Sequence, residues 1–250
     1  MGEAFKDHFS ARSSDYATFR PTYPPALVDY LASLTRTHDL ALDCGCGNGQ
    51  LSCLIAEHYA RVVATDASAQ QIDKAERHPR VEYRVARAEA TGLDAGSVDL
   101  LTVAQAAHWF DLDAFYAEVR RVLRPGGAIV LITYGVTETD RDIKQVVAHF
   151  YREVVGPFWP PERHHVESGY RSLPFPFREE TAPPLAIERQ WSADDLIGYV
   201  GTWSASISAE AALGRAPFEK FAQDLRAAWG DPNLRRLIRW PLSLRIGRIG

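Results

Sequence analysis

The feature that most constrains this chain is a glycine-rich segment at residues 40–51, which reads LALDCGCGNGQL. A short apolar run at its start ends in Asp43, and a helical pattern of apolar residues opens at Gln50. Between them lie the three glycines, Gly45, Gly47 and Gly49. Glycine has no Cβ, so the backbone can turn sharply and approach a ligand closely, and the start of a helix favours negative charge. The segment therefore predicts a strand, a ligand-binding loop and a helix in succession, with a nucleotide-like ligand on the loop.

The spacing of the glycines indicates which kind of nucleotide-like ligand is bound. A dinucleotide fingerprint places glycines at its first, third and sixth positions, beside a pyrophosphate. Counted from Gly45, the sixth position is Gln50, and the third glycine falls at the fifth position. Asp43 precedes the first glycine by two residues. A carboxylate repels a phosphate but attracts an ammonium group, so the spacing favours a cofactor that carries an amino acid.

Further predicted strands follow along the chain and alternate with helices. Residues 61–65 form an apolar run that ends in Asp66, at the distance where an acid typically accepts hydrogen bonds from ribose hydroxyls. Later strands are predicted at 81–86, 97–103 and 128–133, with a helix at 112–123. The fifth strand is preceded by the sequence LRPGG. Strands that alternate with helices predict an α/β fold with a mostly parallel sheet.

The D-x-G-x-G-x-G spelling, together with LRPGG, resembles the class I S-adenosylmethionine-dependent methyltransferases of the type 11 kind over residues 39–134. The resemblance implies a Rossmann-like seven-stranded sheet whose last strand is antiparallel and lies between the fifth and sixth. Helices would cover both faces, with a small helical and aromatic cap. S-adenosyl-L-methionine would be the cofactor. Its expected contacts are Tyr16, Arg20, Asp43, Gly45, Gly47, Gly49, Asp66, Ala67, Ala88, Glu89 and Gln105.

A polar and aromatic segment, residues 105–110, directly follows the fourth strand. Ligands in open α/β sheets bind beyond the carboxyl ends of the strands, so this segment should line the pocket where the methyl group meets its acceptor. We expect Trp109 to form a pocket wall. His108 is a candidate general base for a hydroxyl acceptor, although a single histidine is more often structural.

The chain is expected to form a single methyltransferase domain over residues 1–250. The expected parts are N-terminal cap helices at 1–38, a cofactor-binding core at 39–135 and a C-terminal half at 136–250. The C-terminal half should contain an aromatic lid at 156–184, a sixth strand at 185–191, cap helices at 193–230 and the last strand at 240–249. The lid is dense in proline and aromatic residues. A loop of this length in a compact domain is usually functional or disordered.

Composition limits the partners and the location. The net charge is −4, so the overall charge of the chain does not attract nucleic acid. No run of eighteen apolar residues and no signal-peptide core occur, and we therefore expect a soluble cytoplasmic protein, monomeric or homodimeric, with no membrane partner. The three cysteines, Cys44, Cys46 and Cys53, lie in or beside the glycine loop and are expected to be reduced packing residues, with no metal bound.

The expected activity is methyl transfer to a small-molecule acceptor, at a carboxylate or hydroxyl oxygen. A pattern that includes Tyr23 and a tail ending in LSLRIGRI is similar to the trans-aconitate methyltransferase group, which esterifies carboxylic acids. A carboxylate is already anionic at neutral pH and needs no base, so its site should offer donors, for which Tyr23, His108, Trp203 and Arg245 are candidates. A phenol or carbon acceptor would instead need His108 or a pocket carboxylate as base.

Besides a nucleic-acid methyltransferase, which retention on RNA that weakens steeply with salt would favour, two other function classes remain open from the residues alone. One is a nicotinamide-dependent oxidoreductase, against which Gln50 at the sixth position argues. The other is a binding protein that keeps the cofactor fold without catalysis.

Overall fold

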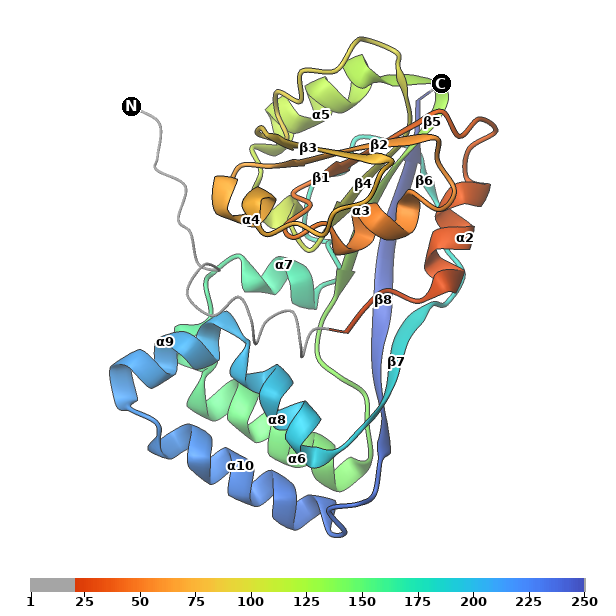
Figure 1. The fold of residues 1–250 in the computed structure, drawn as a ribbon. Helices are drawn as coiled ribbons and strands as arrows, with labels where there is room; N and C mark the ends of the chain where they lie inside the picture. Colours follow the sequence, from red (N-terminus) through yellow and green to blue (C-terminus); the bar gives the residue numbers. More distant parts are fainter. Residues whose placement is uncertain (1–20, 250) are drawn as a thin grey trace.

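Five parallel strands form the upper part of the molecule in the computed structural model, which describes residues 21–249 (Figure 1). They are β1 (Leu40–Cys44), β2 (Arg61–Asp66), β3 (Val81–Val85), β4 (Val98–Ala104) and β5 (Leu123–Tyr134). The strand order is β3-β2-β1-β4-β5-β8-β6. Residues 98–103 of β4 are all buried, as expected for a central strand that helices cover on both faces.

The helices of this part follow the expected strand–helix alternation. They are α2 (Pro25–Ser33), α3 (Gln50–Ile55), α4 (Ala69–Asp73), the short 3-10 helix η2 (Ala107–Trp109) and α5 (Leu112–Val122). Ser68 caps α4, because its hydroxyl accepts a hydrogen bond from the Gln71 amide. The region predicted to hold N-terminal cap helices falls largely on residues 1–20, outside the described residues; α2 is its described part.

The antiparallel last strand, β8 (Arg236–Arg248), lies between β5 and β6 as expected. It begins four residues earlier than the predicted Trp240, because its first half runs beyond the end of β5. There it pairs with β7 (Ala186–Trp191), the predicted sixth strand. The sheet has eight strands rather than seven, since a two-residue strand, β6 (Glu179–Glu180), forms inside the predicted lid and pairs with β8.

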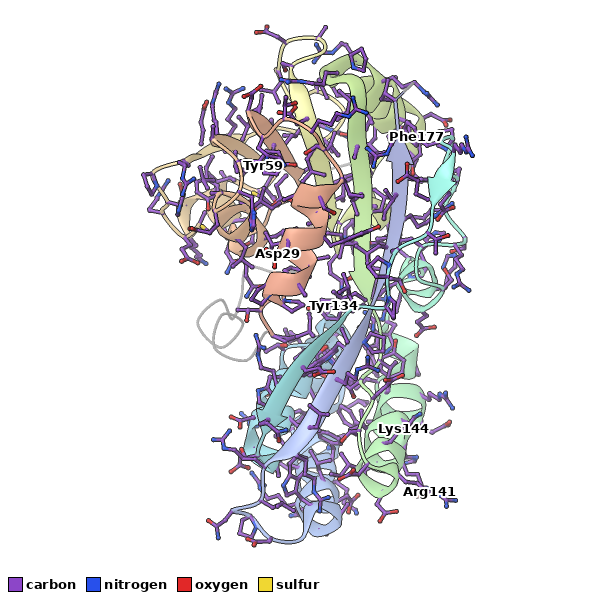
Figure 2. All side chains as sticks on the ribbon, turned by 90° about the vertical axis from the view of Figure 1, so that its right-hand side faces the viewer. Asp29, Tyr59, Tyr134, Arg141, Lys144 and Phe177 are labelled. Carbon is purple, nitrogen blue, oxygen red and sulfur yellow. The ribbon has the colours of Figure 1, made fainter. Side chains whose placement is uncertain are left out.

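A helical cap lies below the sheet (Figure 1). It contains α6 (Arg141–His149), a π-helical turn η3 (Phe150–Val154), α8 (Ala193–Gly201), α9 (Ser204–Leu213) and α10 (Ala216–Trp229). The Phe150 ring stacks on Phe221 of α10 with centroids 4.3 Å apart, which joins two of these helices. Figure 2 places Tyr134 at the junction between sheet and cap, while Arg141 and Lys144 of α6 point outward.

Two expected features of the C-terminal half are corrected. The region 193–230, expected to hold cap helices, is divided into three helices, because α8 ends at Gly201 and α9 ends at Gly214, whose φ is +75°. Pro217 causes no break, since it lies in the first turn of α10, where a missing N–H removes no helical hydrogen bond. The lid is also more regular than expected, with the 3-10 helix η4 (Gly156–Phe158) and α7 (Arg163–Glu167).

Within residues 21–249, none of the helices combines the length and the apolar character that crossing a bilayer requires.

Candidate functional site

The glycine loop is left-handed at all three glycines, with φ values of +67°, +55° and +81° at Gly45, Gly47 and Gly49. A Cβ on Gly45 would lie 2.5 Å from the Ala106 Cβ, and one on Gly49 would lie 2.0 Å from the Tyr83 hydroxyl. A Cβ on Gly47 would meet nothing within 4 Å. The outer glycines therefore make room for protein neighbours. The middle one turns its backbone toward open space, as a loop that cradles a cofactor requires.

Asp43 lies beneath the loop and is 1% exposed. Its two carboxylate oxygens accept hydrogen bonds from the Ser52 hydroxyl at 2.6 Å and the Thr102 hydroxyl at 2.8 Å. Burial raises the pKa of Asp43 to about 6, because desolvation disfavours the charged form more than the two hydroxyls favour it. An ammonium group placed near this carboxylate would stabilise its charged form.

Asp66 closes β2 and is tied to the glycine loop. Its Oδ2 accepts a hydrogen bond from the Gly47 amide at 2.9 Å, and its Oδ1 accepts one from the Ser68 amide at 2.8 Å. Ala67, the next residue, is exposed. Gly47, Asp66 and Ala67 thus lie together at the carboxyl ends of β1 and β2, where the sequence placed the cofactor.

Ala88 and Glu89 follow β3 on the same edge of the sheet. Ala88 is buried, and the Glu89 Oε1 accepts a hydrogen bond from the Asp111 amide at 2.9 Å. Asp111 is the N-cap of α5, so Glu89 joins the loop after β3 to the loop after β4.

Gln105, directly after β4, has a φ of +57°, which is uncommon for a residue other than glycine. Its side-chain amide donates to the Tyr134 carbonyl at 2.9 Å and accepts from the Thr133 hydroxyl at 2.8 Å. The end of β5 therefore holds Gln105 in a conformation that costs of order 1 kcal/mol, a type of strain that clusters at functional sites.

His108 lies in η2 beside Trp109, whose ring centroid is 4.7 Å away and which is 38% exposed. The His108 Nδ1 is 2.9 Å from the Tyr170 hydroxyl. Burial lowers the pKa of His108 to about 3, and the positive charge of Arg163 lowers it further, as does electrostatic interaction with His165. The imidazole is therefore neutral at physiological pH.

Tyr170 belongs to the lid and was not singled out from the sequence. It is fully buried, has a φ of +64°, and its backbone carbonyl accepts a hydrogen bond from Arg245 at 2.9 Å. Arg245 also donates to the Leu173 carbonyl at 2.7 Å and forms an ion pair with Glu179 at 3.0 Å. Arg245 thus contacts the backbone of Tyr170. The sequence offers no signal for the contact between Tyr170 and His108, because the two residues meet only when the lid folds.

The other expected donors lie in separate clusters. Trp203 is 6% exposed and packs in the cap against Tyr151 and Trp159, with centroids 5.4 Å and 5.7 Å away. Tyr23 is buried and packs edge-on against Tyr134 at 6.4 Å. The structure therefore groups His108 and Trp109 and leaves Tyr23, Trp203 and Arg245 apart from one another. Tyr16 and Arg20 lie outside the described residues.

The three cysteines are unpaired, and residues 21–249 hold no group of three or more side chains suited to binding a metal ion.

Comparison with known proteins agrees with this geometry. Residues 42–131 match the family model described as a methyltransferase domain. A Dictyostelium discoideum protein named as a methyltransferase is 38% identical over 80% of this chain and 78% of its own length. An uncharacterised methyltransferase of Mycobacterium tuberculosis is 30% identical over 86% of this chain and 84% of its own length.

Solved structures show the same similarity. A type II methyltransferase from Anaeromyxobacter dehalogenans is 51% identical, with a TM-score of 0.87 over 92% of this chain and 97% of the other. A methyltransferase from an antibiotic biosynthesis pathway of Anabaena variabilis shares the fold at 20% identity, with a TM-score of 0.56 over 90% of this chain and 98% of the other.

The residues present fit the cofactor of such enzymes. The open cradle at Gly47 admits a ligand against the backbone, and the acids Asp43 and Asp66 lie below and beside it. The glycine spacing does not match a pyrophosphate-binding fingerprint, because the sixth position is Gln50 and not glycine. The chain belongs to the class I S-adenosylmethionine-dependent methyltransferases.

Proposed function

We propose that the enzyme methylates an oxygen of a small-molecule acceptor, and that this oxygen belongs to a carboxylate. The observation that supports this acceptor is the environment of His108, which is partly buried, is acted on by the charge of Arg163, and has a pKa lowered to about 3. A base of that strength is poorly matched to a phenol, whose pKa is near 10. A carboxylate arrives already deprotonated and is attracted by the positive charge of Arg163.

For this reaction the protein must align the acceptor with the methyl group and exclude water from the site. S-adenosylmethionine, when bound, supplies an activated methyl group. The Gly47 backbone, Asp43 and Asp66 would hold and orient the cofactor. Gln105, His108 and Trp109 would shape the acceptor side, where fixed geometry replaces the entropy cost of bringing two reactants together. Neutral His108 would orient the acceptor by a hydrogen bond, without moving a proton.

Labelled methyl transfer tests this proposal. The enzyme is incubated with methyl-labelled S-adenosylmethionine and either carboxylates, including trans-aconitate and benzoate, or phenols of similar size. We expect label in a methyl ester, which mild base hydrolyses to labelled methanol, and, at saturating cofactor, a rate that stays flat between about pH 7 and pH 8, above the pKa of Asp43, because His108 does not change its charge there. A base-stable ether, or an essential group titrating near neutrality, would support the hydroxyl acceptor with His108 as base.

A further inference from the structure

Arg163, at the start of α7, is a cation that the sequence did not single out and that the cofactor does not need. Its guanidinium carbon lies 4.5 Å from the Trp159 ring centroid and 5.6 Å from that of Tyr151. The Arg163 Nε donates a hydrogen bond to the Tyr151 hydroxyl at 2.8 Å. Packing on two aromatic rings and one hydrogen bond fix the orientation of the side chain, which is half-buried.

The other end of the guanidinium is available. Within the described part of the chain, neither Nη atom of Arg163 has a hydrogen-bond or ion-pair partner. The nearby Glu167 carboxylate accepts instead from the Tyr151 hydroxyl. The Trp159 indole N–H, also in this cluster, is buried without a hydrogen-bond partner. Two donor groups thus lack acceptors beside one aromatic surface, and buried donors usually have one.

The position of α7 links this cluster to the acceptor side of the site. Figure 1 shows α7 between the sheet and the cap helices. A Cβ on Gly135, just past the end of β5, would lie 4.0 Å from the Val166 carbonyl of α7. The Tyr170 amide donates to the His165 carbonyl at 2.8 Å, and the Tyr170 hydroxyl contacts His108. Two hydrogen bonds therefore connect α7 to His108, and the charge of Arg163 acts on both His108 and Tyr170.

We propose that Arg163 is an anion-binding subsite that selects the acceptor, holding a carboxylate whose flat, apolar body lies against Trp159. A guanidinium stacked on an indole keeps its in-plane N–H groups free for a two-pronged hydrogen bond to a carboxylate. The stacking also reduces the freedom that binding would otherwise remove. This inference rests on the proposed function, because it identifies what the acceptor of that reaction must carry.

The test measures binding and does not require turnover. Calorimetry in the presence of S-adenosylhomocysteine compares three carboxylates, benzoate, cinnamate and trans-aconitate, each with its uncharged amide. For the best-bound acid, Arg163→Gln should weaken binding roughly tenfold or more, the usual effect of losing a charge-assisted hydrogen bond, while the amide is unaffected. Arg163→Lys should retain part of the preference for the acid. Arg171→Gln, an exposed arginine of the same lid, is the matched control and should change neither ligand.

The outcomes separate the subsite from the reaction. If no acid binds wild-type protein better than its amide, or if Arg163→Gln lowers acid and amide affinity alike, the subsite is refuted. If methyl esters form and the Arg163→Gln protein keeps the full preference for acids, the proposed function stands and the subsite does not. If acids bind through Arg163 and only ethers form, the subsite stands and the carboxyl acceptor fails. Unchanged affinity for S-adenosylhomocysteine confirms that the variants are folded.

Discussion

At the scale of single residues, the cofactor side of the site depends on backbone conformation and the acceptor side on tertiary contacts. The glycine motif could be predicted from the sequence because its chemistry is local: three glycines lie between one strand and one helix, and the buried acid Asp43 lies near the end of that strand. Tyr170 and Arg163 could not be predicted, because each reaches His108 across more than fifty residues of chain, through a lid whose local sequence reads as loop.

Replacing Gly47 with alanine should weaken cofactor binding in a way that the same change at a glycine outside the loop does not. The added methyl group would meet no atom of residues 21–249 within 4 Å, so the fold should lose about 1–2 kcal/mol from the left-handed φ alone, while the methyl group would occupy the space proposed for the cofactor. We expect at least a tenfold loss of S-adenosylhomocysteine affinity by calorimetry. Gly92→Ala is the matched control, with a φ of +71° and open space outside the loop. Equal affinity losses in both variants would contradict the cradle.

Cofactor affinity should fall as the pH drops below about 6. The folded pKa of Asp43 is raised above its unfolded value, so folding takes up a proton between about pH 4 and pH 6, and stability declines as pH rises through this window. An ammonium-bearing cofactor needs the charged form, so binding releases that proton at low pH. Calorimetry from pH 5 to 8 should show this loss in the wild type and not in Asp43→Asn, where the titrating group is absent. A flat wild-type profile would show that Asp43 does not face the ammonium.

Removing the Tyr170 hydroxyl should change the imidazole of His108 without changing cofactor affinity. Tyr170→Phe deletes the partner of the His108 Nδ1, so the ¹⁵N shifts of the imidazole should move and kcat should fall, with S-adenosylhomocysteine binding retained. The control is Tyr116→Phe, which removes a buried hydroxyl bonded to the Pro174 carbonyl of the same lid. Identical spectra in wild type and Tyr170→Phe would rule out this positioning role.

At the scale of elements, the main differences from expectation lie where tertiary structure overrides local pattern. The five parallel strands and their helices agree with the apolar periodicity. The lid does not: β6 exists only because β8 offers it an edge, and α7 is a single short helix that a propensity argument cannot detect. The break before α10 lies at Gly214 and not at Pro217, because proline is tolerated in a first helical turn.

The lid should depend on Arg245 for its stability. This side chain is 12% exposed and makes hydrogen bonds to two lid carbonyls and an ion pair with Glu179, so Arg245→Ala leaves buried acceptors unpaired and should cost about 2–3 kcal/mol. Arg239→Ala, which removes more exposed pairs with Glu138 and Glu188, should cost about 1 kcal/mol or less. Urea unfolding of the two variants measures the difference, and equal costs would contradict the role of Arg245.

At the scale of the whole molecule, sheet and cap share one strand. The second half of β8 pairs with β5, and its first half pairs with β7 beside the cap. The link from β5 to α6 is also attached to this strand, because Glu138 and Arg239 exchange backbone hydrogen bonds of 2.7 Å and 2.9 Å. Antiparallel insertion of the last strand was implied by the family resemblance, whereas its extension beyond the sheet depends on β7 and could not be read from alternation alone.

The continuity of β8 has a mechanical consequence. A strand that is hydrogen-bonded along both halves resists bending, so the cap cannot swing open about a flexible linker in the way that hinged enzymes do. Any change in the separation of sheet and cap must come from twisting of β8, which would also rotate the end of β5 that holds Gln105. The entry of a bulky acceptor and the position of Gln105 are then coupled through the twist of a single strand.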